Sequence, residues 1–222
     1  MARDMYGPMT GSSAWMMTAA WDAPYFLLMW AMWAAMMAAM MLPSASPFVL
    51  LYATAAARRA SSGGASQLHA LVGGYLLVWG LFSLAATTLQ WLLGRSGLLT
   101  PMLEPAASAF AAALLLVAGV YQWSPLKRAC LRWCRTPLSL LSSQRRDGAA
   151  GALALGAEHG TYCLGCCWAL MLLLFAGGVM SLTVILALTA LVAVEKLAPF
   201  GEQSARVSGA LLVAAAGWVY LR

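Results

Sequence analysis

The sequence predicts an all-α membrane protein, a polytopic bundle of about six transmembrane helices. Hydrophobic residues make up 63% of the chain and charged residues only 9%, whereas an ordinary soluble domain carries about 25% charged residues. Several windows of about 18 to 20 residues contain no charge, which is typical of helices that span a bilayer. We therefore expect a methionine-containing outer segment at 1–21, followed by a single transmembrane domain at 22–222.

The predicted spans follow from the apolar runs and from the residues that interrupt them. Asp22 and Pro24 are suited to begin the first helix, as a capping side chain and a first-turn proline. Pro43 and Pro47 should kink this helix or end it. The apolar run at 48–57 is then either a bent continuation or an interfacial piece. The expected spans lie at approximately 24–42, 68–93, 106–123, 159–175, 180–197 and 207–221.

The distribution of Lys and Arg predicts the orientation, because cytoplasmic loops carry an excess of these residues. Of the 13 basic residues, ten follow the first, third and fifth spans and three lie on the other side. We therefore expect both termini outside a bacterial inner membrane, and the basic loop at 124–158 inside the cytoplasm. These loops explain the net charge of +6, so the expected partner is the lipid bilayer and not nucleic acid.

One imidazole and three thiols are predicted to share a face of the fourth helix. His159, Cys163, Cys166 and Cys167 are spaced i, i+4, i+7 and i+8. Soft sulfur ligands gathered in this way suit Cu(I), Zn or another thiophilic metal, and they also suit thiol redox chemistry. The alternative is that these cysteines are ordinary small hydrophobic core residues. We predict a metal site, with copper as the expected metal and zinc or another thiophilic metal as the alternative.

A second cysteine pair lies in the basic loop. Cys130 and Cys134 are spaced i and i+4 within 127–135, which is typical of a short amphipathic helix at a membrane surface. The pair either belongs to such a helix by chance or completes the site on the fourth helix. In this topology all five cysteines lie on the reducing side, where stable disulfides are uncommon. We expect the two segments to bring their sulfurs together at the inner boundary of the membrane.

Methionines form a stripe on the first predicted helix. Thioethers are soft ligands for Cu(I), and they also fill gaps in packed helices. Such a stripe is more often packing than a metal path, but its occurrence beside a cysteine and histidine cluster favours a thioether relay. The candidate residues are Met36, Met37, Met40 and Met41.

Two adjacent ionisable residues, Glu195 and Lys196, close the fifth predicted helix. Ionisable groups within a membrane segment indicate a functional site. At the end of a helix, however, the two side chains could instead snorkel towards water as a pair.

These motifs are similar to those of a bacterial membrane family of unknown function, whose members are described as predicted metal-binding integral membrane proteins. The resemblance extends from about residue 22 onward and implies metal binding without implying a mechanism. The segments that carry it are Trp33–Ser44, Gly74–Trp79, Tyr121–Cys134, His159–Met171 and Glu195–Lys196.

The leading hypothesis is an integral membrane protein that binds a soft metal for transport, delivery or sensing, with a membrane protein or a metal chaperone as partner. The alternatives are a membrane thiol–disulfide oxidoreductase and a structural accessory subunit of a larger membrane complex. The sequence has no phosphate-binding glycine loop and no convincing Ser-His-Asp order. These absences exclude an ATP-hydrolysing pump and make an enzyme the less favoured class.

Overall fold

The computed structural model describes residues 21–58, 64–100, 105–136 and 148–221. Regular structure in these ranges is helical, apart from an isolated antiparallel bridge between Leu99 and Pro105. The all-α prediction is therefore confirmed for the described part of the chain. The predicted outer segment, apart from residue 21, lies outside the described residues, as do Arg145 and Arg146 of the basic loop.

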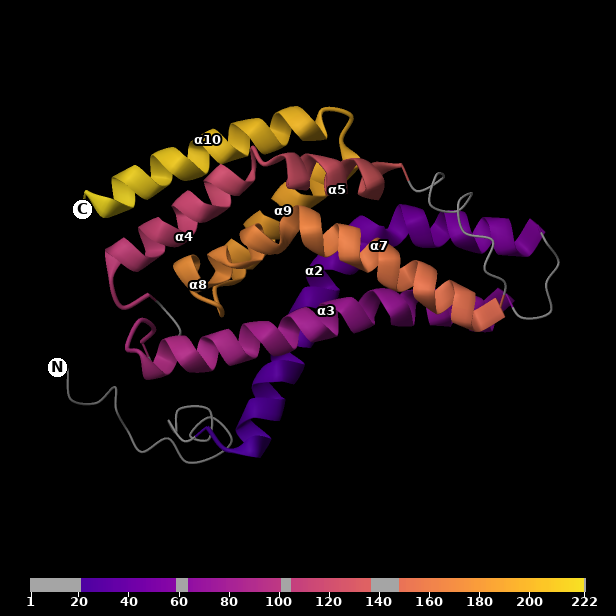
Figure 1. Ribbon diagram of the computed structural model, residues 1–222, viewed down its shortest axis with the longest axis horizontal. Coiled ribbons are helices and arrows are strands. Elements are labelled where there is room, and N and C mark those ends of the chain that lie inside the picture. The colour runs from indigo at the N-terminus through magenta and orange to yellow at the C-terminus, as the bar shows by residue number, and fades with distance from the viewer. Residues whose placement is uncertain (1–20, 59–63, 101–104, 137–147, 222) are drawn as a thin grey trace.

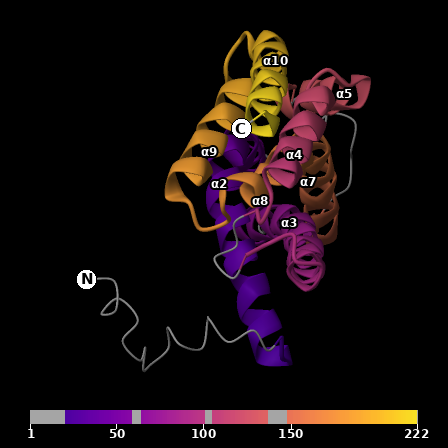
Figure 2. The same ribbon diagram turned by 90° about the vertical axis from the view of Figure 1, so that its left-hand side faces the viewer.

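The helices pack as two neighbouring groups. α3 and α7 lie side by side, and α4 pairs with α10 on the other side of the molecule (Figure 1). The view turned by 90° shows α10 against both α4 and α9 (Figure 2). The described helices are α2 (Ala23–Arg58), α3 (Gly64–Arg95), α4 (Ser108–Tyr121), α5 (Pro125–Arg135), α7 (Gly148–Met171), α8 (Leu173–Gly177), α9 (Leu182–Leu197) and α10 (Gly201–Tyr220).

α2 continues through both of its prolines, so the run at 48–57 is a continuation of the first helix and not a separate piece. The helix changes direction in this region (Figure 1). Pro47 has no N–H to donate to the carbonyl of Pro43, and the Ser46 hydroxyl donates to that carbonyl instead, at 2.8 Å. Side-chain compensation of this kind lets a helix bend at proline without ending.

α7 begins at Gly148, so the predicted start near His159 is wrong and 148–158 is helical. Glycine disfavours an isolated helix, but in α7 it permits close packing on α3. A Cβ on Gly156 would lie 1.9 Å from the Leu71 carbonyl oxygen, and one on Gly74 would lie 2.0 Å from that of Leu153. Only glycine fits at these two positions, and the contact fixes the register of α7 against α3.

α5 confirms the prediction of a short amphipathic helix in the basic loop. It begins at Pro125, and the Ser124 side chain accepts a hydrogen bond from the Lys127 backbone N–H at 3.1 Å. A proline in the first turn and a serine cap before it are the expected signals for a helix start. The helix follows α4 after a bend of 65°.

Three helical segments are long and apolar enough to cross a membrane: Ala23–Ala55, Gly64–Arg95 and Gly148–Gly177. A fourth candidate is α4 with α5, taken as one broken span. α9 has 16 residues, fewer than the roughly 20 that usually span a bilayer. The expectation of about six spans is therefore supported for three segments, or for four with the bent pair.

Candidate metal centre

The three thiols of α7 lie inside the core, as their helical spacing predicts. Cys163, Cys166 and Cys167 are each 1% exposed. The Cys166 and Cys167 thiols both donate to the Cys163 carbonyl, at 3.1 and 2.8 Å. The register set by the glycine contacts with α3 directs these side chains towards α2, α3 and α5.

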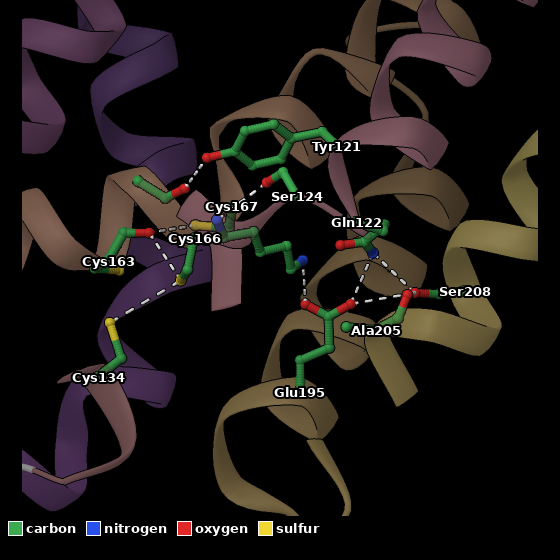
Figure 3. Close-up of polar contacts among 12 residues, drawn as sticks. Tyr121, Gln122, Ser124, Cys134, Cys163, Cys166, Cys167, Glu195, Ala205 and Ser208 are labelled. Carbon is green, nitrogen blue, oxygen red and sulfur yellow. Dashed lines mark hydrogen bonds and ion pairs between the residues drawn. The ribbon is translucent and has the colours of Figure 1, made fainter. Parts of the chain in front are cut away.

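The structure places Cys134 of α5 beside Cys166 of α7 (Figure 3). The Cys134 sulfur lies 4.0 Å from the Cys166 sulfur. The Cys130 sulfur lies over Gly165, where an added Cβ would approach it to 2.7 Å. A zinc–thiolate bond is about 2.3 Å long, so two sulfurs that share a metal ion lie about 3.8 to 4.6 Å apart, depending on the angle at the metal. The Cys134–Cys166 separation falls within this range.

α2 contributes a second sulfur contact to the α7 cysteines. The Cys167 sulfur lies 4.0 Å from the Met41 sulfur. Met37 and Met40 are buried in the same core, and Met36 packs against it from a partly exposed position. Of the four predicted methionines, Met41 is thus placed in contact with a thiol.

His159 lies one turn before Cys163 and is 4% exposed. Its ring stacks on Phe48, with 4.1 Å between ring centroids and 17° between planes. Its Nδ1 atom is buried without a hydrogen-bond partner among the described residues. Burial of a ring nitrogen without a hydrogen-bond partner costs free energy. The Nδ1 atom is therefore a candidate ligand atom beside the sulfur cluster, defined as the sulfurs of Cys134, Cys163, Cys166, Cys167 and Met41.

Cys163 is held by groups that the sequence did not assign to it. The Lys196 ammonium lies 2.8 Å from the Cys163 sulfur and 3.3 Å from the Ser44 hydroxyl. The Tyr75 hydroxyl lies 3.0 Å from the same sulfur and also donates to the Met41 carbonyl, at 3.3 Å. Cys163 therefore faces a cation and a neutral hydroxyl.

Glu195 and Lys196 do not pair with each other, so the pairing alternative is wrong. Adjacent residues on a helix point in different directions, and Glu195 faces Lys127, with 2.6 Å between Nζ and Oε2. Gln122 and Ser208 also hydrogen-bond Glu195, at 2.8 and 3.2 Å (Figure 3). Lys127, which lies in the segment predicted to be a cytoplasmic basic loop, is fully buried.

The described residues provide two pairs of soft sulfur donors but not a closed metal site with a full set of ligands. No group of three His, Cys, Asp or Glu side chains in the described ranges is placed to hold a metal ion as it stands. Structural zinc sites use four converging ligands, which this geometry does not supply. Pairs of thiolate or thioether sulfurs select Cu(I) instead, and both pairs here are spaced for one shared ion.

A family model, described as PpoB2, copper chaperone, matches residues 30–219. The matched region contains all five cysteines, His159 and the methionine stripe. No curated protein and no solved structure matches the chain.

Proposed function

The chain belongs to the PpoB2 copper chaperone family, and from this premise we propose that it is a membrane protein that binds Cu(I) as cargo and passes it to a partner. The observation that carries the proposal is the part-buried Cys134–Cys166 sulfur pair, 4.0 Å apart and contributed by two different helices. Two sulfurs at this spacing fit one Cu(I) ion. The expected partner is a membrane protein or a soluble metal chaperone with its own sulfur ligands.

The second sulfur pair supports delivery over permanent storage. Cys166 and Cys167 are neighbours on α7, and Cys167 contacts Met41 of α2. A cargo ion held by two sulfurs has an adjacent thiol and thioether to which it can exchange without leaving the core. Met36, Met37 and Met40 extend this proposed thioether path along α2, and His159 with Cys163 borders it.

The proposed setting is a bacterial inner membrane, with α9 and α10 completing six spans and both termini outside. Three long apolar helices support a membrane location. The excess of basic residues after the first, third and fifth predicted spans supports the orientation. The exposed side chains of Trp123 and Trp133, beside and on the basic helix α5, suit a lipid headgroup region.

Copper content of the full chain, purified in detergent under reducing conditions, tests the proposal. We expect about one Cu(I) per chain, and a loss of at least about tenfold in affinity in the Cys134→Ser/Cys166→Ser variant, because both ligands are replaced by hard hydroxyl groups. Cys130→Ser is the matched control, since its sulfur packs on Gly165 in the same interface. Unchanged copper binding in the double variant would refute the proposed site, and zinc in place of copper would identify the alternative metal.

The same sulfur distance favours a second candidate, thiol–disulfide exchange. In that case the Cys134 and Cys166 thiols would pass two electrons and two protons to a disulfide of a partner protein, forming a bond between their sulfurs. Differential alkylation separates the two functions. A copper site keeps all five thiols reduced and shielded by the metal, whereas exchange chemistry yields an oxidised Cys134–Cys166 pair. A structural accessory subunit would tolerate the serine variants without change in either measurement.

A further inference from the structure

The Lys196 side chain is a buried cation whose described contacts are a sulfur and a hydroxyl. Its residue is 8% exposed, and its Nζ lies 2.8 Å from the Cys163 sulfur and 3.3 Å from the Ser44 hydroxyl. The ion pairs formed by the described residues join Lys127 with Glu195 and Arg132 with Glu202, and neither includes Lys196. The neighbouring carboxylate is thus already paired, and the Lys196 charge is directed at the sulfur cluster.

A buried ammonium beside soft ligands has two effects on a metal-binding cluster. It occupies Cys163, which lies one helical turn from Cys166 and Cys167 and would otherwise be available to bridge metal ions. It also repels any cation that enters the cluster, and this repulsion is strong because the core has a low effective dielectric constant. Two thiolates with one Cu(I) carry a net charge of −1, which the Lys196 ammonium balances. A second Cu(I) would add a positive charge that is not offset while Cys163 is held by the ammonium.

We propose that Lys196 limits the cluster to a single Cu(I) ion and prevents assembly of a polynuclear copper–thiolate cluster. This inference rests on the proposed copper function and adds the residue that sets its stoichiometry. Five cysteines and several methionines provide more sulfur than one Cu(I) needs, and Cu(I) readily shares thiolates between ions. A delivery protein has to release its ion, and a single ion held by two sulfurs exchanges more readily than one bridged within a cluster.

The test compares the copper stoichiometry of Lys196→Gln with that of the wild-type chain, both purified in detergent and titrated with Cu(I). Gln keeps a polar side chain, one heavy atom shorter, and removes the positive charge. We expect about one copper per chain in the wild type and about two or more in Lys196→Gln. The luminescence that marks polynuclear Cu(I)–thiolate clusters should appear only in the variant.

Three controls separate charge from structure. Lys196→Arg keeps the charge and should bind one copper. Tyr75→Phe removes a neutral hydroxyl from the same sulfur and should also bind one. Cys163→Ser should still bind one, because Cys134 and Cys166 hold the ion, and this variant tests the inference even where Lys196→Gln does not fold.

The outcomes of the two proposals differ. A wild-type chain that binds no copper would refute the copper function itself. A wild-type chain that already binds several ions, a Lys196→Gln variant that binds one, or loss of all copper in Cys163→Ser would overturn the role of Lys196 and leave the copper function standing.

Discussion

The two faces of α9 at its C-terminal end hold two different kinds of buried cluster. Glu195 faces Lys127, Gln122 and Ser208, where both charges are paired within one network of hydrogen bonds. Lys196 faces Cys163, Ser44 and the sulfur cluster, where sulfurs lie 4.0 Å apart and the His159 Nδ1 atom has no partner among the described residues. The first cluster pairs its two charges with each other and leaves one neutral atom, the Gln122 Oε1, without a partner among the described residues, whereas the second holds a cation with no described carboxylate beside it and soft sulfur atoms. We therefore expect the buried polar groups of the first cluster to stabilise the fold and those of the second to bind a ligand.

The largest effect on stability is expected from the Glu195 cluster. Glu195→Ala leaves the Lys127 ammonium buried without its carboxylate, and breaking a buried pair in this way costs about 3 to 5 kcal/mol. Thermal unfolding in detergent would measure this loss. The matched variant Lys127→Met/Glu195→Leu removes both charges and should recover most of the stability. A single variant as stable as the wild type would show that water reaches the Lys127–Glu195 pair.

Substitution in the sulfur cluster should change stability little and copper affinity strongly. Cys166→Ser is nearly isosteric, and its hydroxyl can still donate to the Cys163 carbonyl, so we expect a stability loss of about 1 kcal/mol. Copper affinity should fall by at least about tenfold, equivalent to about 1.4 kcal/mol, in a chelator competition assay. If stability fell as far as in Glu195→Ala while copper binding held, the comparison between the two clusters would fail.

The smallest effect on both stability and copper affinity is expected from Tyr75→Phe. This variant tests whether Tyr75 supports the sulfur cluster without binding the metal. The hydroxyl contacts the Cys163 sulfur and the Met41 carbonyl, and loss of a typical hydrogen bond costs about 0.5 to 1.5 kcal/mol. The ring still fills its space in the core, so copper affinity should change by less than about tenfold. Thermal unfolding and copper titration of the same sample measure both values, and a large loss of copper would make Tyr75 part of the binding site.

Local patterns in the sequence predicted the helices and the faces on which chemistry lies. The spacing of Cys163, Cys166 and Cys167 predicted that they share one face, and the spacing of Cys130 and Cys134 within the basic segment 127–135 predicted the amphipathic helix α5. Periodicity identifies a face but not its partner. The contact of Cys134 with Cys166 was therefore an expectation about two segments until the fold placed α5 on α7.

The features that the sequence analysis did not predict have physical reasons. Glycine in 148–158 lowers the apparent helix propensity, whereas Gly156 permits close packing on α3. The ion pair of Lys127 has no signal in the local sequence, because its neighbours are basic and its carboxylate partner lies 68 residues away. Tyr75 and Gln122 stand in apolar runs, where a lone polar side chain is the available signal that a buried partner exists.

The hydrogen bonds from Cys166 and Cys167 to the Cys163 carbonyl make each thiol its own vibrational label. The S–H stretch absorbs in a window that is free of protein, lipid and water bands, and its frequency falls as the thiol donates more strongly. Infrared difference spectra of the chain before and after loading would therefore register which sulfurs lose their protons, without any probe being attached. The Cys163 carbonyl, which accepts hydrogen bonds from both thiols, would therefore report on binding of the proposed copper ion.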